Sequence, residues 1–132
     1  MSRILLDTHL LLWAVAEPKK LPPAARSRID GAEVFVSAAS IWEVSIKAAL
    51  GKIAADPAEL LAEIEPAGFT LLPVTGEHAA AVSLLPAVHT DPFDRMLVAQ
   101  AKTEPLLLLT NDVILAGYGE CVELAIPKPR RT

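Results

Sequence analysis

The stretch S-R-I-L-L-D-T (residues 2–8) opens the chain and decides how the rest is arranged. Its uninterrupted apolar run, residues 4–6, is typical of a central strand that is covered on both faces of a parallel sheet. Asp7 follows where this strand should end, and residues 10–13 indicate a helix directly after it. Ligands of open α/β sheets bind outside the carboxyl ends of the strands, so Asp7 stands where such folds carry out chemistry. An aspartate here could equally cap the following helix, and the stretch alone leaves both roles open.

The rest of the chain alternates strand-like and helix-like segments. We expect strands at residues 34–36, 69–74, 106–109 and 121–124, helices at 21–29, 38–50, 56–65, 76–85 and 92–103, and a short turn or helix at 113–116. Pro73 places its strand near an edge of the sheet. The alternation predicts an α/β fold, a three-layer α/β/α sandwich around a mostly parallel sheet of four to five strands. One domain over residues 1–126 and a basic tail over 127–132 account for the length.

Composition narrows the class of protein. No apolar run approaches the roughly 18 residues that a membrane helix needs. The single cysteine, Cys121, excludes an intramolecular disulfide and a cysteine-based zinc site, and we therefore expect a cytoplasmic protein. A net charge of −4 does not suit a general basic surface for nucleic acid, but it suits a protein that gathers acids around a cation. The hydrophobic content of 52% also predicts an apolar surface that a partner covers.

Four of the sixteen acids stand out by their position: Asp7, Glu43, Asp94 and Asp112. Glu43 lies in the helix after the second strand, and Asp94 lies in the first turn of the helix before the fourth strand. Asp112 follows the fourth strand within three residues. If the first and fourth strands are neighbours, all four acids point toward one rim of the sheet. Carboxylates that lie close together repel one another without a cation, and Mg²⁺ prefers oxygen ligands, so this rim is a predicted metal site.

Each of these acids also has a local structural explanation. S-I-W-E at 40–43 fits a capping box, and its glutamate could pair with Lys47 one turn later. D-P-F-D at 91–94 is an ordinary helix start, which the chain repeats as D-P-A-E at 56–59 without any suspected function. T-N-D at 110–112 could form an Asx-type turn. Only the joint placement of the acids at one rim favours the metal site.

Four motifs in their order along the chain resemble those of a known family. They are L-L-D-T at 5–8, W-E at 42–43, H-T-D-P-F-D-R-M-L-V-A-Q-A at 89–101 and L-L-T-N-D at 108–112. The chain resembles the PIN domain family, and more narrowly the toxin components of VapBC-type toxin–antitoxin pairs. The third motif is the most specific, and the resemblance spans nearly the whole chain.

The resemblance implies a three-layer α/β/α fold and an endoribonuclease that depends on Mg²⁺ or Mn²⁺, with one or two cations per active site. In that scheme a metal-activated water hydrolyses RNA phosphodiester bonds. The residues that match the family's metal ligands and catalytic acids are Asp7, Glu43, Asp94 and Asp112. Those expected to assist them are Thr8, Asp91, Thr110 and Asn111, and the candidates for RNA contact are Arg95 and Lys47. The resemblance also implies inhibition by a cognate VapB-type antitoxin.

The apolar composition predicts protein partners. We expect a homodimer, and an antitoxin segment that lies in an apolar groove near the first helices and shields the acids. His9, His78 and His89 are expected to be surface or hydrogen-bonded side chains without a role in the chemistry. Trp13 and Trp42 are expected to pack in the core, because they lie at helical spacing among apolar residues.

Three other classes of protein are alternatives to a PIN-type nuclease. A phosphatase of the haloacid-dehalogenase kind needs a second aspartate two residues after the first, where this chain has His9. A phosphoacceptor receiver domain needs a pair of acids after the first strand, and Asp7 stands alone there. A non-catalytic PIN-like module, whose acids only hold a metal or a basic partner, remains open.

Overall fold

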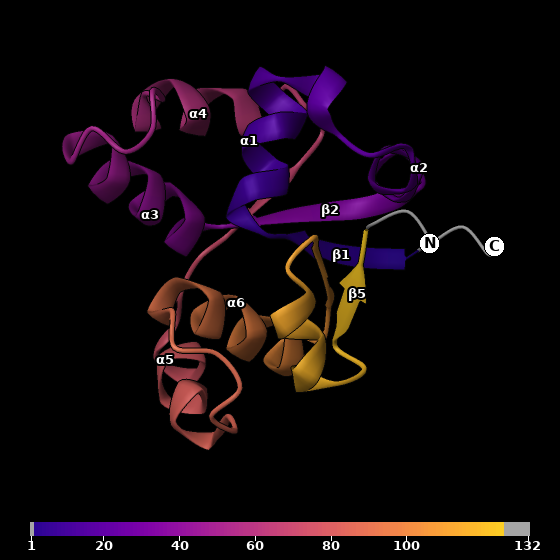
Figure 1. Ribbon diagram of the computed structural model, residues 1–132, viewed down its shortest axis with the longest axis vertical. Helices are drawn as coiled ribbons and strands as arrows, with labels where there is room; N and C mark the ends of the chain where they lie inside the picture. The colour runs from indigo at the N-terminus through magenta and orange to yellow at the C-terminus, as the bar shows by residue number, and fades with distance from the viewer. Residues whose placement is uncertain (1, 126–132) are drawn as a thin grey trace, which may run out of the picture.

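The computed structural model describes residues 2–125 and shows a five-stranded sheet between two layers of helices (Figure 1). The strands are β1 (Ser2–Leu6), β2 (Ala32–Ser37), β3 (Thr70–Leu72), β4 (Leu107–Thr110) and β5 (Val122–Leu124). They lie in the order β3-β2-β1-β4-β5, and every pairing is parallel. The predicted α/β class is confirmed, and β1 and β4 are neighbours, as the metal-site hypothesis requires.

The helices divide between the two faces of this sheet. They are α1 (Thr8–Ala16), α2 (Pro23–Asp30), α3 (Ala38–Ala49), α4 (Pro57–Ile64), α5 (Gly76–Ala81) and α6 (Pro92–Thr103), with 3₁₀ segments η1 (Pro18–Lys20), η2 (Val82–Leu84) and η3 (Val113–Tyr118). Figure 1 shows α1, α2 and α4 on one side of the sheet and α5 and α6 on the other. Helix α3 continues from the end of β2 and packs against α1, α4 and α6. No helix within residues 2–125 has the length and apolar character that crossing a membrane requires.

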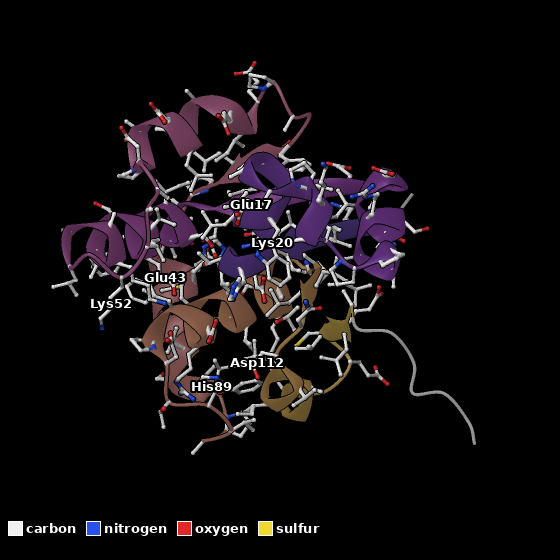
Figure 2. All side chains as sticks on the ribbon, turned by 45° about the horizontal axis from the view of Figure 1, so that its top comes forward. Glu17, Lys20, Glu43, Lys52, His89 and Asp112 are labelled. Carbon is white, nitrogen blue, oxygen red and sulfur yellow. The ribbon has the colours of Figure 1, made fainter. Side chains whose placement is uncertain are left out.

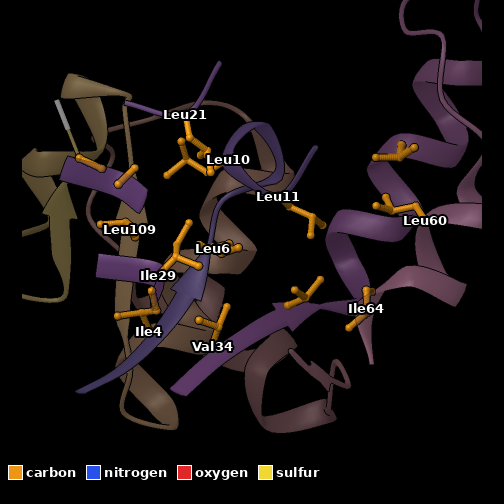
Figure 3. Close-up of a cluster of buried hydrophobic side chains, with 14 residues drawn as sticks. Ile4, Leu6, Leu10, Leu11, Leu21, Ile29, Val34, Leu60, Ile64 and Leu109 are labelled. Atoms are coloured by element: carbon orange, nitrogen blue, oxygen red, sulfur yellow. The ribbon is translucent and has the colours of Figure 1, made fainter. Parts of the chain in front are cut away.

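The apolar run of β1 supplies both halves of the core. Ile4 and Leu6 point into the cluster on the side of α1, α2 and α4, which Figure 3 shows. Leu5 points into the opposite cluster beneath α6. All three side chains are fully buried, and each contributes about 1.5–3 kcal/mol by leaving water. The central position of β1 therefore follows from this pattern.

The register between β1 and β4 brings the ends of these two strands to the same edge of the sheet. Leu6 pairs with Leu109, and the Asp7 amide donates a hydrogen bond to the Leu109 carbonyl at 3.1 Å. The residues that follow β1 and those that end β4 therefore meet at the same edge of the sheet. This alignment brings together side chains about a hundred positions apart in the sequence.

Several predicted boundaries were wrong. The strand expected at 69–74 is only Thr70–Leu72, because it is an edge strand that pairs with β2 alone and Pro73 has no amide hydrogen to extend the ladder. The helix expected at 76–85 ends at Ala81 and continues as η2, since the residue before Pro86 is held in an extended conformation.

Other segments differ in smaller ways. The helix expected from residue 21 begins at Pro23, and the turn at 113–116 extends as 3₁₀ helix to Tyr118. Trp42 is 63% exposed, so its expected place in the core was wrong, whereas Trp13 packs half-buried against the core. The proposed basic tail at 127–132 lies outside the described residues.

Candidate active site

A small polar cavity of about 210 Å³ opens at the carboxyl ends of β1 and β4. Its wall includes all four acids singled out in the sequence: Asp7, Glu43, Asp94 and Asp112. Thr8, Lys47 and Asp91 line it as well. The acids come from the end of β1, the middle of α3, the first turn of α6 and the loop after β4. The structure therefore collects at one place side chains that are scattered along the whole chain.

Asp7 is nearly buried and held at both carboxylate oxygens. Its Oδ1 accepts a hydrogen bond from the Leu10 amide at 2.8 Å, and its Oδ2 accepts one from the Thr110 hydroxyl at 2.5 Å. Asp7 thus caps α1 and faces the cavity, so the two roles that the sequence left open are compatible. Burial raises the pKa of the Asp7 carboxyl above its ordinary value, with the two hydrogen bonds acting in the opposite direction.

Glu43 is fixed by partners from two helices. The Thr8 hydroxyl donates to Oε1 at 2.6 Å, and Lys47 Nζ donates to Oε2 at 2.5 Å. The ion pair expected with Lys47 is present, and this hydrogen bond raises the pKa of the lysine. The expected capping box is absent, because Ser37 caps α3 by accepting from the Ala39 amide. The Glu43 carboxylate is thus held by side chains rather than by the backbone amide at the helix start, and it lines the cavity.

Asp94 lies close to the negative charges of other acids. Asp91 caps α6 by accepting hydrogen bonds from the amides of Phe93 and Asp94, and it directs the first turn toward the cavity. The pKa of Asp94 rises to about 7, first because of burial and then because of the negative charges of Asp91 and Glu43. A crowded carboxylate of this kind is stabilised by a cation.

The repeated helix start provides an internal comparison. Asp56 caps α4 as Asp91 caps α6, by accepting from the amides of Ala58 and Glu59. Glu59 nevertheless faces solvent, whereas Asp94 faces the cavity. The same local motif therefore has two different surroundings, and only the packing of the helix distinguishes them.

Asp112 is held by a histidine that the sequence analysis set aside. Asp112 Oδ1 accepts from the Ile114 amide at 2.9 Å, and Oδ2 lies 3.1 Å from His89 Nε2. Figure 2 shows His89 and Asp112 side by side at the site. The same ring nitrogen is 3.6 Å from Asp94 Oδ2. The position of His89, two residues before the D-P-F-D motif, is the signal that could have pointed to it.

The remaining predicted polar residues take different places. Thr110 lies beneath the cavity, where its hydroxyl donates to Asp7 and accepts from the Asp112 amide at 3.0 Å. Asn111 does not line the cavity. It therefore makes no direct contribution to the wall that the four acids form.

The Arg95 guanidinium is occupied by neighbouring oxygens. Its Nη1 donates to the Pro86 carbonyl and to the Tyr118 hydroxyl, each at 3.1 Å, and its Nη2 donates to the Val82 carbonyl at 3.1 Å. These contacts fix the segment before α6. Lys47, whose side chain is 40% exposed, lies at the cavity and has a charged group that RNA could reach.

Comparison with known protein families identifies the family of this chain. The PIN domain model matches residues 4–120. This chain belongs to the PIN domain family. Ribonuclease VapC22 of Mycobacterium tuberculosis (strain ATCC 25618 / H37Rv) is 33% identical over 125 residues, which cover 89% of this chain and 93% of that protein. The resemblance to VapC-type PIN domains is therefore confirmed.

Solved structures share this PIN fold. The DNA-bound VapBC of Salmonella typhimurium matches with a TM-score of 0.68 and 19% identity, over 96% of this chain and 100% of that chain. VapBC2 of Rickettsia felis, bound to a DNA fragment from its promoter, matches with a TM-score of 0.66 and 12% identity, over 92% and 96% of the two chains. At these identities the comparison shows the fold, and it agrees with the predicted α/β/α sandwich.

The donor set of this PIN domain fits a hard divalent cation. Four carboxylates offer oxygen atoms, which Mg²⁺ and Mn²⁺ prefer to nitrogen or sulfur. Burial raises the pKa of Asp7 and of Asp94, and neighbouring negative charges raise the pKa of Asp94 further, so the cavity disfavours ionised carboxylates. A cation would remove that penalty, because it attracts every carboxylate in the cavity.

Proposed function

We propose that this PIN domain is a Mg²⁺- or Mn²⁺-dependent endoribonuclease, and that it is the toxin of a cytoplasmic type II toxin–antitoxin pair. The observation that carries the proposal is the convergence of four acids on one cavity at the carboxyl ends of β1 and β4. The name of the relative Ribonuclease VapC22 supports the reaction class, and the similar VapBC complexes support an antitoxin partner.

In this proposal the chain prepares the ligand oxygens before the substrate arrives. Asp7, Glu43, Asp94 and Asp112 would hold one or two cations. When bound, such a cation makes water more acidic and offsets negative charge on the phosphate. The hydrogen bonds to Asp7 and Glu43 limit the rotation of both carboxylates, so little reorganisation is needed when the site is loaded.

The proposed reaction is hydrolysis of a phosphodiester. The water oxygen forms a bond to phosphorus as the bond from phosphorus to the 3′ oxygen breaks. One fragment keeps a 5′-phosphate, and the other gains a proton on its 3′ oxygen. Lys47, beside Glu43 at the cavity, is the proposed contact for an RNA phosphate. Arg95 is left out of this role, because its guanidinium already donates to backbone carbonyls and Tyr118.

A groove beside the cavity is the proposed contact for a protein partner. It has a volume of about 640 Å³ and lies between α3, α5 and α6. The antitoxin groove expected near the first helices stays a prediction. Trp42 and Phe93 meet edge to face in its wall, with ring centroids 5.2 Å apart. The exposed side chain of Val74 also lines the groove, and the exposed side chain of Leu71 belongs to β3, the strand just before Val74. A second copy of the chain would cover this surface in the proposed homodimer.

The test is metal-dependent cleavage of a panel of tRNA and rRNA. We expect the wild type to cleave at least one RNA with Mg²⁺ or Mn²⁺, and to stop cleaving when EDTA is added. Asp94→Asn should abolish cleavage, while Glu59→Gln, the matched change in the repeated motif, should leave it intact. Circular dichroism checks that both variants fold.

Two outcomes would contradict the proposal. Full cleavage by a folded Asp94→Asn variant would remove Asp94 from the chemistry. Binding of Mn²⁺ by the wild type with no cleavage of any RNA in the panel would favour the non-catalytic module instead.

A further inference from the structure

His89 has a hydrogen-bond partner at each ring nitrogen. The Asp91 amide lies 3.0 Å from Nδ1, and Asp112 Oδ2 lies 3.1 Å from Nε2. A backbone amide can only donate, so Nδ1 must accept. A neutral imidazole with an accepting Nδ1 carries its hydrogen on Nε2. The Nε2–H group therefore points at the carboxylates of the active site.

From this geometry we propose that His89 is a positioning residue that holds the Asp112 carboxylate by donating from Nε2, and that it is not a metal ligand. A ring nitrogen that carries a hydrogen has no free lone pair for a cation. His89, Asp94 and Asp112 lie close enough to form a three-residue metal site, with ligand atoms within 4.8 Å of one another, but the tautomer excludes the nitrogen. The inference rests on the proposed function, because it concerns a ligand of the same cation.

The Asp112 carboxylate has one hydrogen-bond partner at each oxygen within residues 2–125. Asp112 belongs to the loop after β4, and its side chain is 34% exposed. Oδ1 is held by the Ile114 amide, and within residues 2–125 His89 supplies the hydrogen bond to Oδ2. Without that donor, the carboxylate can turn about its bond to Cβ and the orientation of Oδ2 is lost. Side chains that orient a ligand in this way commonly change metal affinity without touching the metal.

The rest of the structure keeps the imidazole in place. The His89 amide donates to the Tyr118 hydroxyl at 3.0 Å, and Arg95 Nη1 donates to the same hydroxyl. Tyr118 is buried at the end of η3, the segment that starts directly after Asp112. Arg95 and Tyr118 thus fix the backbone of His89 relative to the segment that carries its partner. These hydrogen bonds keep the imidazole ring close to the Asp112 carboxylate.

Two isosteric variants separate the two ring nitrogens. His89→Asn keeps an acceptor for the Asp91 amide but has no group at the position of Nε2. His89→Gln can place an amide donor near that position. We expect His89→Asn to weaken Mn²⁺ binding by about 10- to 100-fold, measured by electron paramagnetic resonance on the full chain. His89→Gln should recover most of this loss, and circular dichroism should show both variants folded.

A second measurement reads the tautomer directly. Long-range proton–nitrogen NMR correlations on the ¹⁵N-labelled protein at mildly alkaline pH should show the His89 hydrogen on Nε2, with and without Mg²⁺. A hydrogen on Nδ1 would overturn the inference. So would equal losses of Mn²⁺ affinity in the Asn and Gln variants, because an amide cannot replace an imidazole ligand.

The outcomes also separate this inference from the proposed function. If the wild type binds Mn²⁺ and His89→Asn binds it as tightly, only the positioning role fails. If the wild type binds no Mn²⁺, the metal-dependent function fails, and the positioning role fails with it.

Discussion

Replacing Asp94 by asparagine should stabilise the metal-free protein at neutral pH. Burial and the charges of Asp91 and Glu43 raise the pKa of Asp94 from 3.8 to about 7 in the folded chain. In the unfolded chain the carboxyl returns to its ordinary value, so the folded state binds the proton more tightly. The contribution of Asp94 to stability therefore falls as pH rises from about 4 to about 7, and it remains at its low value above that range.

The magnitude follows from the pKa and the exposure of the side chain. A rise from 3.8 to about 7, at about 1.36 kcal/mol for each pH unit, sets an upper limit of about 4 kcal/mol. The side chain is 23% exposed, so solvent screens part of this repulsion. Asparagine also loses the attraction of a negative charge to the N-terminus of α6, which is about 0.3–1 kcal/mol. We expect Asp94→Asn to raise the free energy of unfolding by about 2 kcal/mol above neutral pH, and by almost nothing near pH 4.

Urea unfolding in EDTA, followed by circular dichroism from about pH 4 to about pH 8, measures this difference. Glu59→Gln is the control, because it removes the same helix-start charge at an exposed site and should be slightly destabilising. Excess Mg²⁺ should reverse the order of wild type and Asp94→Asn, because the metal stabilises the form with the better ligands. A variant that is no more stable than the wild type in EDTA at about pH 8 would refute the electrostatic argument.

Three further outcomes are expected. Affinity for Mn²⁺, measured by calorimetry, should fall as pH drops below about 7, because the metal then competes with a proton on Asp94; an affinity independent of pH would contradict this. Trp42→Glu should shift a homodimer toward monomer in analytical ultracentrifugation, since Trp42 is 63% exposed in the apolar groove; an unchanged dimer would place the interface elsewhere. Leu108→Ala should lower the free energy of unfolding by about 2–5 kcal/mol in urea, because the side chain is fully buried in β4; a loss well under 1 kcal/mol would show that the core collapses around the gap.

The two acids that follow strands, Asp7 and Asp112, could be placed from the sequence. Asp7 directly follows an apolar run, and Asp112 follows another after two residues, so their meeting at one rim requires that β1 and β4 are found and that these strands are neighbours. The adjacency of these strands was an assumption, and their pairing confirms it. Alternating patterns and uninterrupted apolar runs are sufficient to locate these strands in the sequence, because the side chains of a strand point to only two faces.

The part of the site on helices and loops could not be predicted locally. The motif that begins with Asp91 and the motif that begins with Asp56 cap their helices in the same way, and the packing of α6 alone turns one of them toward the cavity. His89 gains its partner from a segment 23 positions away. Trp42 sits at helical spacing, but its face of α3 looks onto a groove. In each case the deciding contact is tertiary, and helical periodicity does not specify it.

The hydrogen bonds at both carboxylate oxygens of Asp7 affect the choice of substitution for an inactive form of this protein. Because Oδ1 caps α1, Asp7→Ala would remove a structural hydrogen bond together with a cavity carboxylate, and loss of the proposed toxicity could then reflect a poorly folded chain. A genetic selection for harmless variants would recover such changes readily. Asp94→Asn leaves the cap of α6 to Asp91, so it is the better choice for producing the protein in living cells and for isolating it together with the proposed antitoxin.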